Sequence, residues 1–226
     1  MREPIVLAWS GGKDSARALL ALRQDPAWEV VGLLTTVTAD YGRVSMHGIR
    51  REVLHAQAEA VGLPLEEVPI RAGGDDEHYS AAMSAGLDRL GARYPWLRTV
   101  AFGDLFLEDV RKWREERLAR IEWRGHFPLW GRDTSELARE VLALGFRTTI
   151  CCVDTQQLGI GFAGREYGAE LLADLPAGVD PCAERGEFHT CVHAGPVFRA
   201  PLRLRKGGVV LRDERFAFCD LTLAPE

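Results

Sequence analysis

Short apolar segments alternate with helical segments through the first half of the chain, and this alternation restricts the fold more than any other feature. Strands are expected over residues 5–9, 28–36, 65–70 and 99–102, and helices over 14–22, 47–61, 77–90 and a charged segment that ends near residue 120. The continuously apolar segment 5–9 is typical of a strand covered on both faces. Strands separated by helices of this length predict βαβ units. We therefore predict an α/β fold with a doubly wound, Rossmann-like parallel sheet.

The pattern changes after Pro128. Helices are expected over residues 135–144 and 164–175, and short strands over 147–153, 188–193, 197–204 and 209–223. Such a mixture is typical of an α+β arrangement. We place a boundary near Gly131 and predict two domains, residues 1–130 and a smaller C-terminal α+β domain over residues 131–226.

Composition excludes several classes of protein. The chain has 226 residues, 46% of them hydrophobic and 27% charged, which is ordinary for a globular protein. The formal net charge of −5 disfavours a general nucleic-acid surface, which needs a basic face. No apolar stretch approaches the length of a membrane span, and the N-terminal residues show no cleavable signal pattern. Five irregularly spaced cysteines favour a reduced, cytoplasmic protein over a disulfide scaffold. From the apolar pattern and the charge, no membrane partner is expected and a nucleic-acid partner is disfavoured.

The segment between the first strand and the first helix reads Ser10-Gly11-Gly12-Lys13-Asp14-Ser15. Two glycines allow a sharp turn and a close approach of the backbone to a ligand. The N-terminus of the following helix offers N–H groups and a positive dipole end to phosphate oxygens. Lys13 adds a positive charge, and Asp14 suits a Mg²⁺ ion that bridges phosphate oxygens. The segment therefore predicts a phosphate-binding loop.

This loop lacks the spacing of the Walker loop and of the dinucleotide fingerprint. It resembles the PP-loop signature, Ser-Gly-Gly-x-Asp-Ser, of the ATP pyrophosphatase superfamily. The resemblance implies that the loop holds the β,γ-pyrophosphate of ATP while an acceptor oxygen attacks the α-phosphorus and becomes adenylated. The reaction class follows from the loop, whereas the acceptor stays open.

Further segments are similar to the diphthine–ammonia ligase family. They are residues 45–48, 57–64, 102–105, 127–130 and 178–190. The last resembles the signature Gly-Glu-Asn-Gly-Glu-Phe-His-Thr, but Ala183 stands in place of Gly and Arg185 in place of Asn. The chain is identified as a member of this family, and residues 104–111 look like those of a bacterial branch.

The resemblance implies a ligase that activates a carboxylate as an acyl adenylate and lets ammonia displace AMP. In archaeal and eukaryotic members the carboxylate belongs to diphthine, a modified His of elongation factor 2. The expected cofactors are ATP and Mg²⁺, and the expected partners are ammonia and a carboxylate acceptor on a protein side chain or a small molecule. Residues 1–130 would bind ATP and residues 131–226 would bind the acceptor. Whether the protein forms a homodimer is left open.

Site residues follow from these expectations. The predicted nucleotide contacts are Ser10, Gly11, Gly12, Lys13, Ser15, His47, Gly103 and Asp104. Asp14 and Asp104 are expected near Mg²⁺, although Asp104 could equally cap the next helix. Glu187 and His189 stand two apart in an expected strand and so share a face. They are predicted to position ammonium and remove its proton, with Glu184 as a third acceptor contact and Lys13 and Asp14 as further catalytic groups.

Two other functions and one metal site remain open at this stage. Cys151, Cys152 or Cys182 would carry sulfur in a PP-loop thiolation enzyme. A nucleotide-binding sensor without turnover would use the same loop. A zinc site at Cys182, His189, Cys191 and His193 lacks the close cysteine pairs of structural zinc.

Overall fold

A parallel sheet forms the first half of the protein. The computed structural model describes residues 2–225, and the elements of this half are β1 (Glu3–Ala8), α1 (Lys13–Gln24), β2 (Trp28–Thr38), β3 (Arg43–Val44), α2 (Arg51–Val61), β4 (Leu65–Ile70), α3 (Asp76–Arg93), β5 (Thr99–Ala101), α4 (Glu108–Ala119) and β6 (Arg124–His126). Strand β1 pairs in parallel with β2 and β5, β2 with β4, and β5 with β6, while the short β3 runs antiparallel to β2. The predicted parallel α/β sheet is confirmed.

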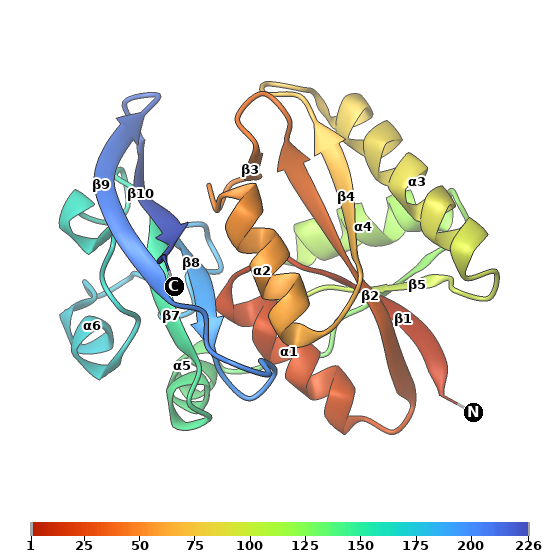
Figure 1. The fold of residues 1–226 in the computed structure, drawn as a ribbon, viewed down its shortest axis with the longest axis horizontal. Coiled ribbons are helices and arrows are strands. Elements are labelled where there is room, and N and C mark those ends of the chain that lie inside the picture. Colours follow the sequence, from red (N-terminus) through yellow and green to blue (C-terminus); the bar gives the residue numbers. More distant parts are fainter. Residues whose placement is uncertain (1, 226) are drawn as a thin grey trace.

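Helices cover both faces of this sheet, and the side chains of β1 show why. Ile5 and Leu7 belong to the hydrophobic cluster that contains Leu19 of α1 and residues of α2. Val6 points the other way, into a second cluster with Leu87 of α3 and residues of α4. Successive strand residues face opposite sides, so a continuously apolar strand requires two apolar covers. Figure 1 shows α1 and α2 on one side of the sheet and α4 behind it.

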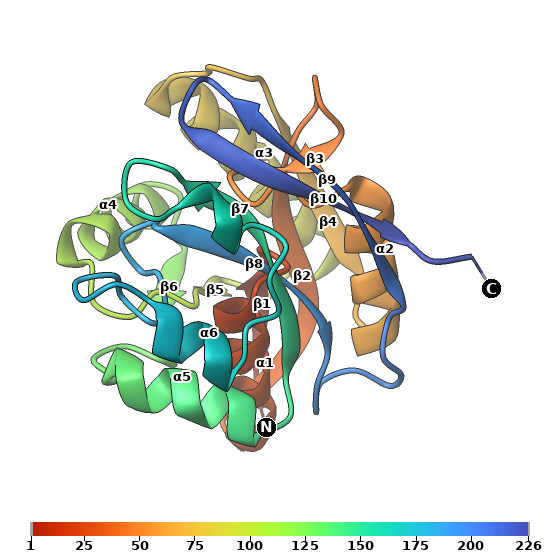
Figure 2. The ribbon, with the colours of Figure 1, turned by 90° about the vertical axis from the view of Figure 1, so that its left-hand side faces the viewer.

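An antiparallel sheet forms the second half. Its elements are α5 (Thr134–Ala143), β7 (Arg147–Asp154), the 3₁₀ turn η1 (Ile160–Phe162), α6 (Ala169–Asp174), β8 (Phe188–Ala194), β9 (Leu204–Arg212) and β10 (Phe216–Leu223). The strand order is β8-β7-β10-β9. This sheet lies beside α1 and α2, with α6 on its other side, and Glu140 of α5 pairs with Arg17 of α1 (Figures 1 and 2). The predicted smaller α+β portion is confirmed.

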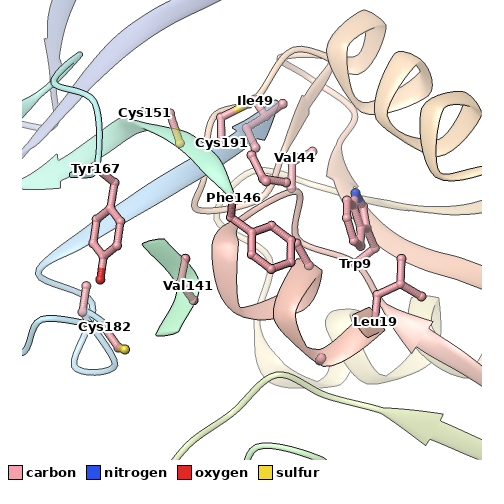
Figure 3. Close-up of a cluster of buried hydrophobic side chains, with 14 of the residues drawn as sticks. Trp9, Leu19, Val44, Ile49, Val141, Phe146, Cys151, Tyr167, Cys182 and Cys191 are labelled. Atoms are coloured by element: carbon pink, nitrogen blue, oxygen red, sulfur yellow. The ribbon is translucent and has the colours of Figure 1, made fainter. Parts of the chain in front are cut away.

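One hydrophobic cluster joins the two halves. It contains Trp9 and Leu19 from the first half and Phe146, Cys151 and Tyr167 from the second, all nearly without exposure (Figure 3). This shared cluster holds the antiparallel sheet against α1. Because both halves contribute to one cluster, the division into two domains at residues 130 and 131 stays a prediction.

Two predicted helices are shorter than expected. The helix expected from residue 47 begins at Arg51, because Met46 and Gly48 adopt positive φ angles of 63° and 67° and form a turn. The helix expected over residues 164–175 covers only Ala169–Asp174. The first part of the expected helix instead runs extended beside β7, where Glu166 forms an antiparallel β-bridge with Thr149.

The strand predictions near the C-terminus also need correction. Residues 197–203 form a loop rather than a strand, and β9 begins at Leu204. The single strand expected over 209–223 is a hairpin, because Asp213 and Glu214 have φ angles of 50° and 52° and reverse the chain between β9 and β10. The short strands β3 and β6 carry no period that the sequence could show. No helix within residues 2–225 combines the length and apolar character needed to cross a membrane.

Candidate active site

The predicted phosphate loop opens into a cavity of about 370 Å³. The cavity lies at the carboxyl ends of β1, β2 and β5, where parallel sheets bind ligands. Its lining includes most of the predicted site residues: Ser10, Lys13, Asp14, Ser15, His47, Gly103, Asp104, Glu184 and His189. Gly11 and Gly12 form the backbone behind this wall. Both halves of the chain thus contribute side chains to one cavity.

The loop requires both glycines. Gly11 has a φ of +77°, and a Cβ atom there would lie 2.7 Å from Gln57 Oε1. A Cβ on Gly12, the residue before α1, would lie 3.0 Å from the Nε2 atom of His47. At Gly103 a Cβ would come within 3.1 Å of the backbone of Asp14 and Ser15. The three glycines let the start of α1 approach its neighbours closely, and we call this arrangement, which is typical of anion-binding helix N-termini, the glycine cradle.

Gln57 and Thr190 brace the loop from the opposite side, and sequence reasoning did not select either. The fully buried Gln57 donates from Nε2 to the carbonyl oxygens of Gly11 (3.0 Å) and Val192 (2.6 Å), and its Oε1 accepts from Trp9 Nε1 (3.2 Å). Thr190 Oγ1 accepts from the backbone N–H of Lys13 at 3.0 Å. The sequence signal for Gln57 was a Gln on the otherwise apolar face of α2. A buried side-chain amide there needs hydrogen-bond partners, which indicates a bracing role.

Lys13 lines the cavity but is almost fully buried. Its Nζ donates to Asp14 Oδ2 at 2.8 Å and to the carbonyl oxygen of Cys182. The rings of Tyr167 and Phe188 lie 5.6 Å and 5.7 Å from the ammonium. Burial alone would lower the pKa of Lys13, but the charge and hydrogen bond of Asp14, together with Cys182 and Asp180, outweigh it and the pKa is raised. The lysine therefore stays protonated and ties α1 to the second half of the chain.

Three carboxylates face the cavity: Asp14, Asp104 and Glu184. Asp14 Oδ1 is buried and accepts no hydrogen bond within residues 2–225. Asp104 pairs with Arg114 through two contacts of 2.9 Å and 3.3 Å. It does not cap the following helix, because the residue at that cap is Leu107. An unpartnered carboxylate oxygen beside a second carboxylate fits a hydrated Mg²⁺ ion that also binds phosphate oxygens.

Glu184 has the pKa nearest neutrality in the cavity. Its Oε1 accepts from the backbone N–H groups of Leu105 (2.6 Å) and Phe106 (3.3 Å). Burial, aided by the charges of Asp14 and Asp104, raises the pKa of Glu184 to about 7 in spite of those hydrogen bonds. A carboxylate with such a pKa can exchange a proton near physiological pH.

His47 and His189 stack against each other with ring centroids 4.5 Å apart. Burial, with the charge of Lys13, lowers the pKa of His189 to about 4, and burial also lowers the pKa of His47 well below its usual value. Both imidazoles are therefore neutral at pH 7. The expected near-neutral pKa belongs to Glu184, not to His189.

The expected pairing of Glu187 with His189 at the cavity is not present. Glu187 is buried away from the cavity, and its Oε1 accepts from the backbone N–H of Asp180 at 3.0 Å. The Asp180 carboxylate in turn accepts from the N–H groups of Cys182 (3.3 Å) and Glu184 (2.9 Å). Glu187 thus shapes the turn that carries Glu184.

Two arginines at the start of α2 form ion pairs and do not line the cavity. Arg50 makes two contacts of 2.8 Å with Asp220, and Arg51 pairs with Glu67 at 2.7 Å. In the signature segment, Ala183 has a φ of +58°. This backbone conformation favours glycine, which is the residue that the family signature has at this position. Arg185 lies exposed, with its guanidinium 5.4 Å from the ring of Phe106.

The cysteines are free thiols, and Cys182 alone among them lines the cavity in the described part of the chain. Its Sγ donates to the carbonyl oxygen of Thr134 at 3.2 Å, and burial raises its pKa. Cys151 and Cys152 are buried in β7. Within residues 2–225 no group of three or more His, Cys, Asp or Glu side chains is arranged to hold a metal ion.

A parallel sheet, a glycine cradle at the start of α1 and cavity carboxylates together define a nucleotide-binding protein of the PP-loop type. Residues 3–122 match the family model of the diphthamide synthase N-terminal domain, and residues 133–221 match that of the diphthamide synthase C-terminal domain. The chain therefore belongs to the diphthamide synthase family, whose members are PP-loop, ATP-using ligases. No curated protein sequence matches it.

Proposed function

We propose that the protein adenylates a carboxylate with ATP and amidates it with ammonia, releasing AMP and pyrophosphate. The observation that carries this proposal is that the start of α1, from Lys13 to Ser15, and Glu184, whose pKa is raised to about 7, face one cavity. A cradle for pyrophosphate supplies adenylation, and a nearby base supplies the proton transfer that amide formation needs.

On the nucleotide side, the backbone of Gly11 and Gly12 and the hydroxyls of Ser10 and Ser15 hold the pyrophosphate. Asp14 and Asp104 would hold Mg²⁺, which screens the negative charge of the leaving group when bound. Lys13 orients Asp14 through their 2.8 Å contact and partly offsets the burial that raises the pKa of Asp14. His47 and Gly103 line the path to the α-phosphate, with His47 as a neutral donor or acceptor.

On the acceptor side, the ammonia nitrogen attacks the acyl carbon, and the bond from that carbon to the AMP oxygen breaks. Glu184 takes the proton that the nitrogen loses, while the neutral His189 orients the nucleophile by hydrogen bonding. Glu187 acts through Asp180 by positioning Glu184. In this account residues 1–130 bind ATP and residues 131–226 supply the groups at the reacting end of the acceptor, in a protein that works in the reducing cytoplasm. The acceptor is a carboxylate on a protein side chain, as diphthine would be, or on a small molecule.

The test is to incubate the protein with ATP, Mg²⁺, ammonium and ¹⁸O-labelled carboxylates. Adenylation followed by amidation moves one carboxylate oxygen to AMP, so mass spectrometry should find ¹⁸O in AMP and a new amide in equal amounts. The variant Asp14→Asn should lose both products, and the exposed control Asp88→Asn should keep them. ADP as the only nucleotide product would contradict the proposal. ATP that is bound but stays intact would favour a sensor instead.

A further inference from the structure

A second pocket, of about 200 Å³, lies between α3 and α4. It shares four lining residues with the active-site cavity: Tyr79, Met83, Phe102 and Arg114. The two spaces therefore meet at a common wall. The family match and the proposed function leave this α3–α4 pocket without a role.

The interior of the α3–α4 pocket is apolar. Leu87 and Leu118 are buried beside Phe102, and Met83 and Ile121 pack against the same cluster. A pocket with such a lining favours an aliphatic or aromatic group, because the transfer of apolar surface out of water is favourable.

The rim of the pocket is cationic. Arg114, Arg117 and Arg120 follow one another at every third position of α4 and its C-terminal cap, and all three line the pocket. Arg114 is held by Asp104. Arg117 stacks 3.9 Å above the ring of Trp113 and contacts Asp76 at 3.2 Å. Arg120 forms no ion pair within the described residues and is exposed, so its guanidinium is available to an anion.

The two spaces hold different charged groups. The active-site cavity holds the pairs of Lys13 with Asp14 and Arg114 with Asp104, and also Glu184, whereas arginines are the only charged residues that line the α3–α4 pocket in the described part of the chain. A substrate that spans both would place its reacting carboxylate near the phosphate loop, its apolar part in the α3–α4 pocket, and a second anionic group at Arg120.

We propose that the α3–α4 pocket binds the distal part of the acceptor, and that the acceptor is a small organic acid with an apolar body and a second anionic group. This inference rests on the proposed function and names its substrate class. The shared lining residues make the two spaces neighbours, and the proposal places one end of the acceptor in each.

The test measures binding of octanedioate and octanoate by calorimetry, with Mg²⁺ and a non-hydrolysable ATP analogue present. The two probes have the same length, and only octanedioate has the second carboxylate. Octanedioate should bind about tenfold more tightly, as expected for one charge-assisted contact. Arg120→Ala should remove this preference, whereas Lys112→Ala, on the exposed side of the same helix, should preserve it.

A second pair of variants tests the apolar part. Ser84 lines the pocket and is half-buried, so Ser84→Phe should fill the space and weaken both probes by about tenfold. Ala85→Phe, on the exposed face of α3, should leave both affinities unchanged. Thermal unfolding of each variant reports whether it is folded.

Equal affinities for the two probes, absence of binding, or a Ser84→Phe effect on the nucleotide analogue instead of the probes would overturn the inference. If AMP formation with a carboxylate is unchanged by Arg120→Ala and Ser84→Phe, the inference is overturned as well, while the proposed function stands. ADP as the product would overturn the proposed function, while the binding preference would still be measured independently.

Discussion

The two walls of the active-site cavity are built in different ways. The loop wall is backbone, turned by Gly11 and Gly12 and fastened by Gln57 and Thr190 through hydrogen bonds to main-chain atoms. The acceptor wall consists of side chains carried by the turn from Asp180 to Gly186, with the carboxylates of Asp180 and Glu187 bonded to backbone N–H groups. In the proposed reaction the first wall binds the pyrophosphate that every ATP presents, and the second contacts the acceptor.

This difference predicts how each wall responds to change. Rigid backbone tolerates no added atom, so changes in the loop should remove activity altogether. The acceptor wall contains titratable side chains, so substitutions there should alter the dependence of activity on pH. The predictions that follow run from the largest expected effect to the smallest.

Gly11→Ala should have the largest effect. The added Cβ would lie 2.7 Å from Gln57 Oε1 and would force a side chain into the left-handed region. Loss of positioning and of N–H donors to phosphate each cost on the order of 100-fold, so we expect AMP release to fall at least about 1000-fold. Gly73→Ala is the matched control, because Gly73 has a φ of +66° and open space around it. A Gly11→Ala enzyme of normal rate would break the rigid-wall account.

Glu184→Gln tests the acceptor wall. Because deprotonated Glu184 accepts a proton, AMP release by the wild-type protein should rise with pH around a midpoint near pH 7. The variant should lack this rise and be about 100-fold slower at pH 8. The control Glu170→Gln, on the exposed face of α6, should keep the wild-type pH profile.

The same group also predicts a dependence of stability on pH. The folded-state pKa of Glu184, about 7, lies above the ordinary value of 4.5, so the folded state binds the proton more tightly than the unfolded state. Stability should therefore decline as the pH rises from about 4.5 through 7, and this part of the decline should vanish in Glu184→Gln. An unchanged stability profile in the variant would argue against a raised pKa.

Gln57→Leu should loosen the loop without touching the cavity. The substitution leaves the buried Val192 carbonyl and the Trp9 indole N–H without this partner. We expect the free energy of unfolding to drop by about 2–4 kcal/mol and AMP release by about tenfold. Urea denaturation checks the first and an activity assay the second. Gln24→Leu, at an exposed site on α1, should change stability by less than about 0.5 kcal/mol.

The smallest effect is expected for the cysteines of β7. Cys151→Ala and Cys152→Ala should change AMP release by less than about twofold, since these thiols are buried and burial raises the pKa of both. Loss of turnover in either folded variant would instead favour a thiolation reaction.

How far the sequence could predict the protein also differs between the walls. The loop is encoded locally, because a strand, two glycines and a helix follow one another within residues 3–24. The parallel sheet followed from the same kind of local alternation. The short strands β3 and β6 could not be predicted, since two or three residues carry no period.

The acceptor wall depends on tertiary contacts. Strand parity pointed to Glu187, but the chain turns at Gly186, before β8 begins, and Glu184 is the glutamate that reaches the cavity. The raised pKa of Glu184 arises from burial beside Asp14 and Asp104, which are far away in sequence. No pattern within one segment contains that information.

The most direct test of the central claim is the identity of the phosphorus products. Phosphorus NMR should follow the wild-type protein with ATP, Mg²⁺, ammonium and a mixture of carboxylates. Cleavage at the α-phosphorus predicts AMP and pyrophosphate in equal amounts, and neither should form with Gly11→Ala. Formation of ADP and inorganic phosphate would contradict it.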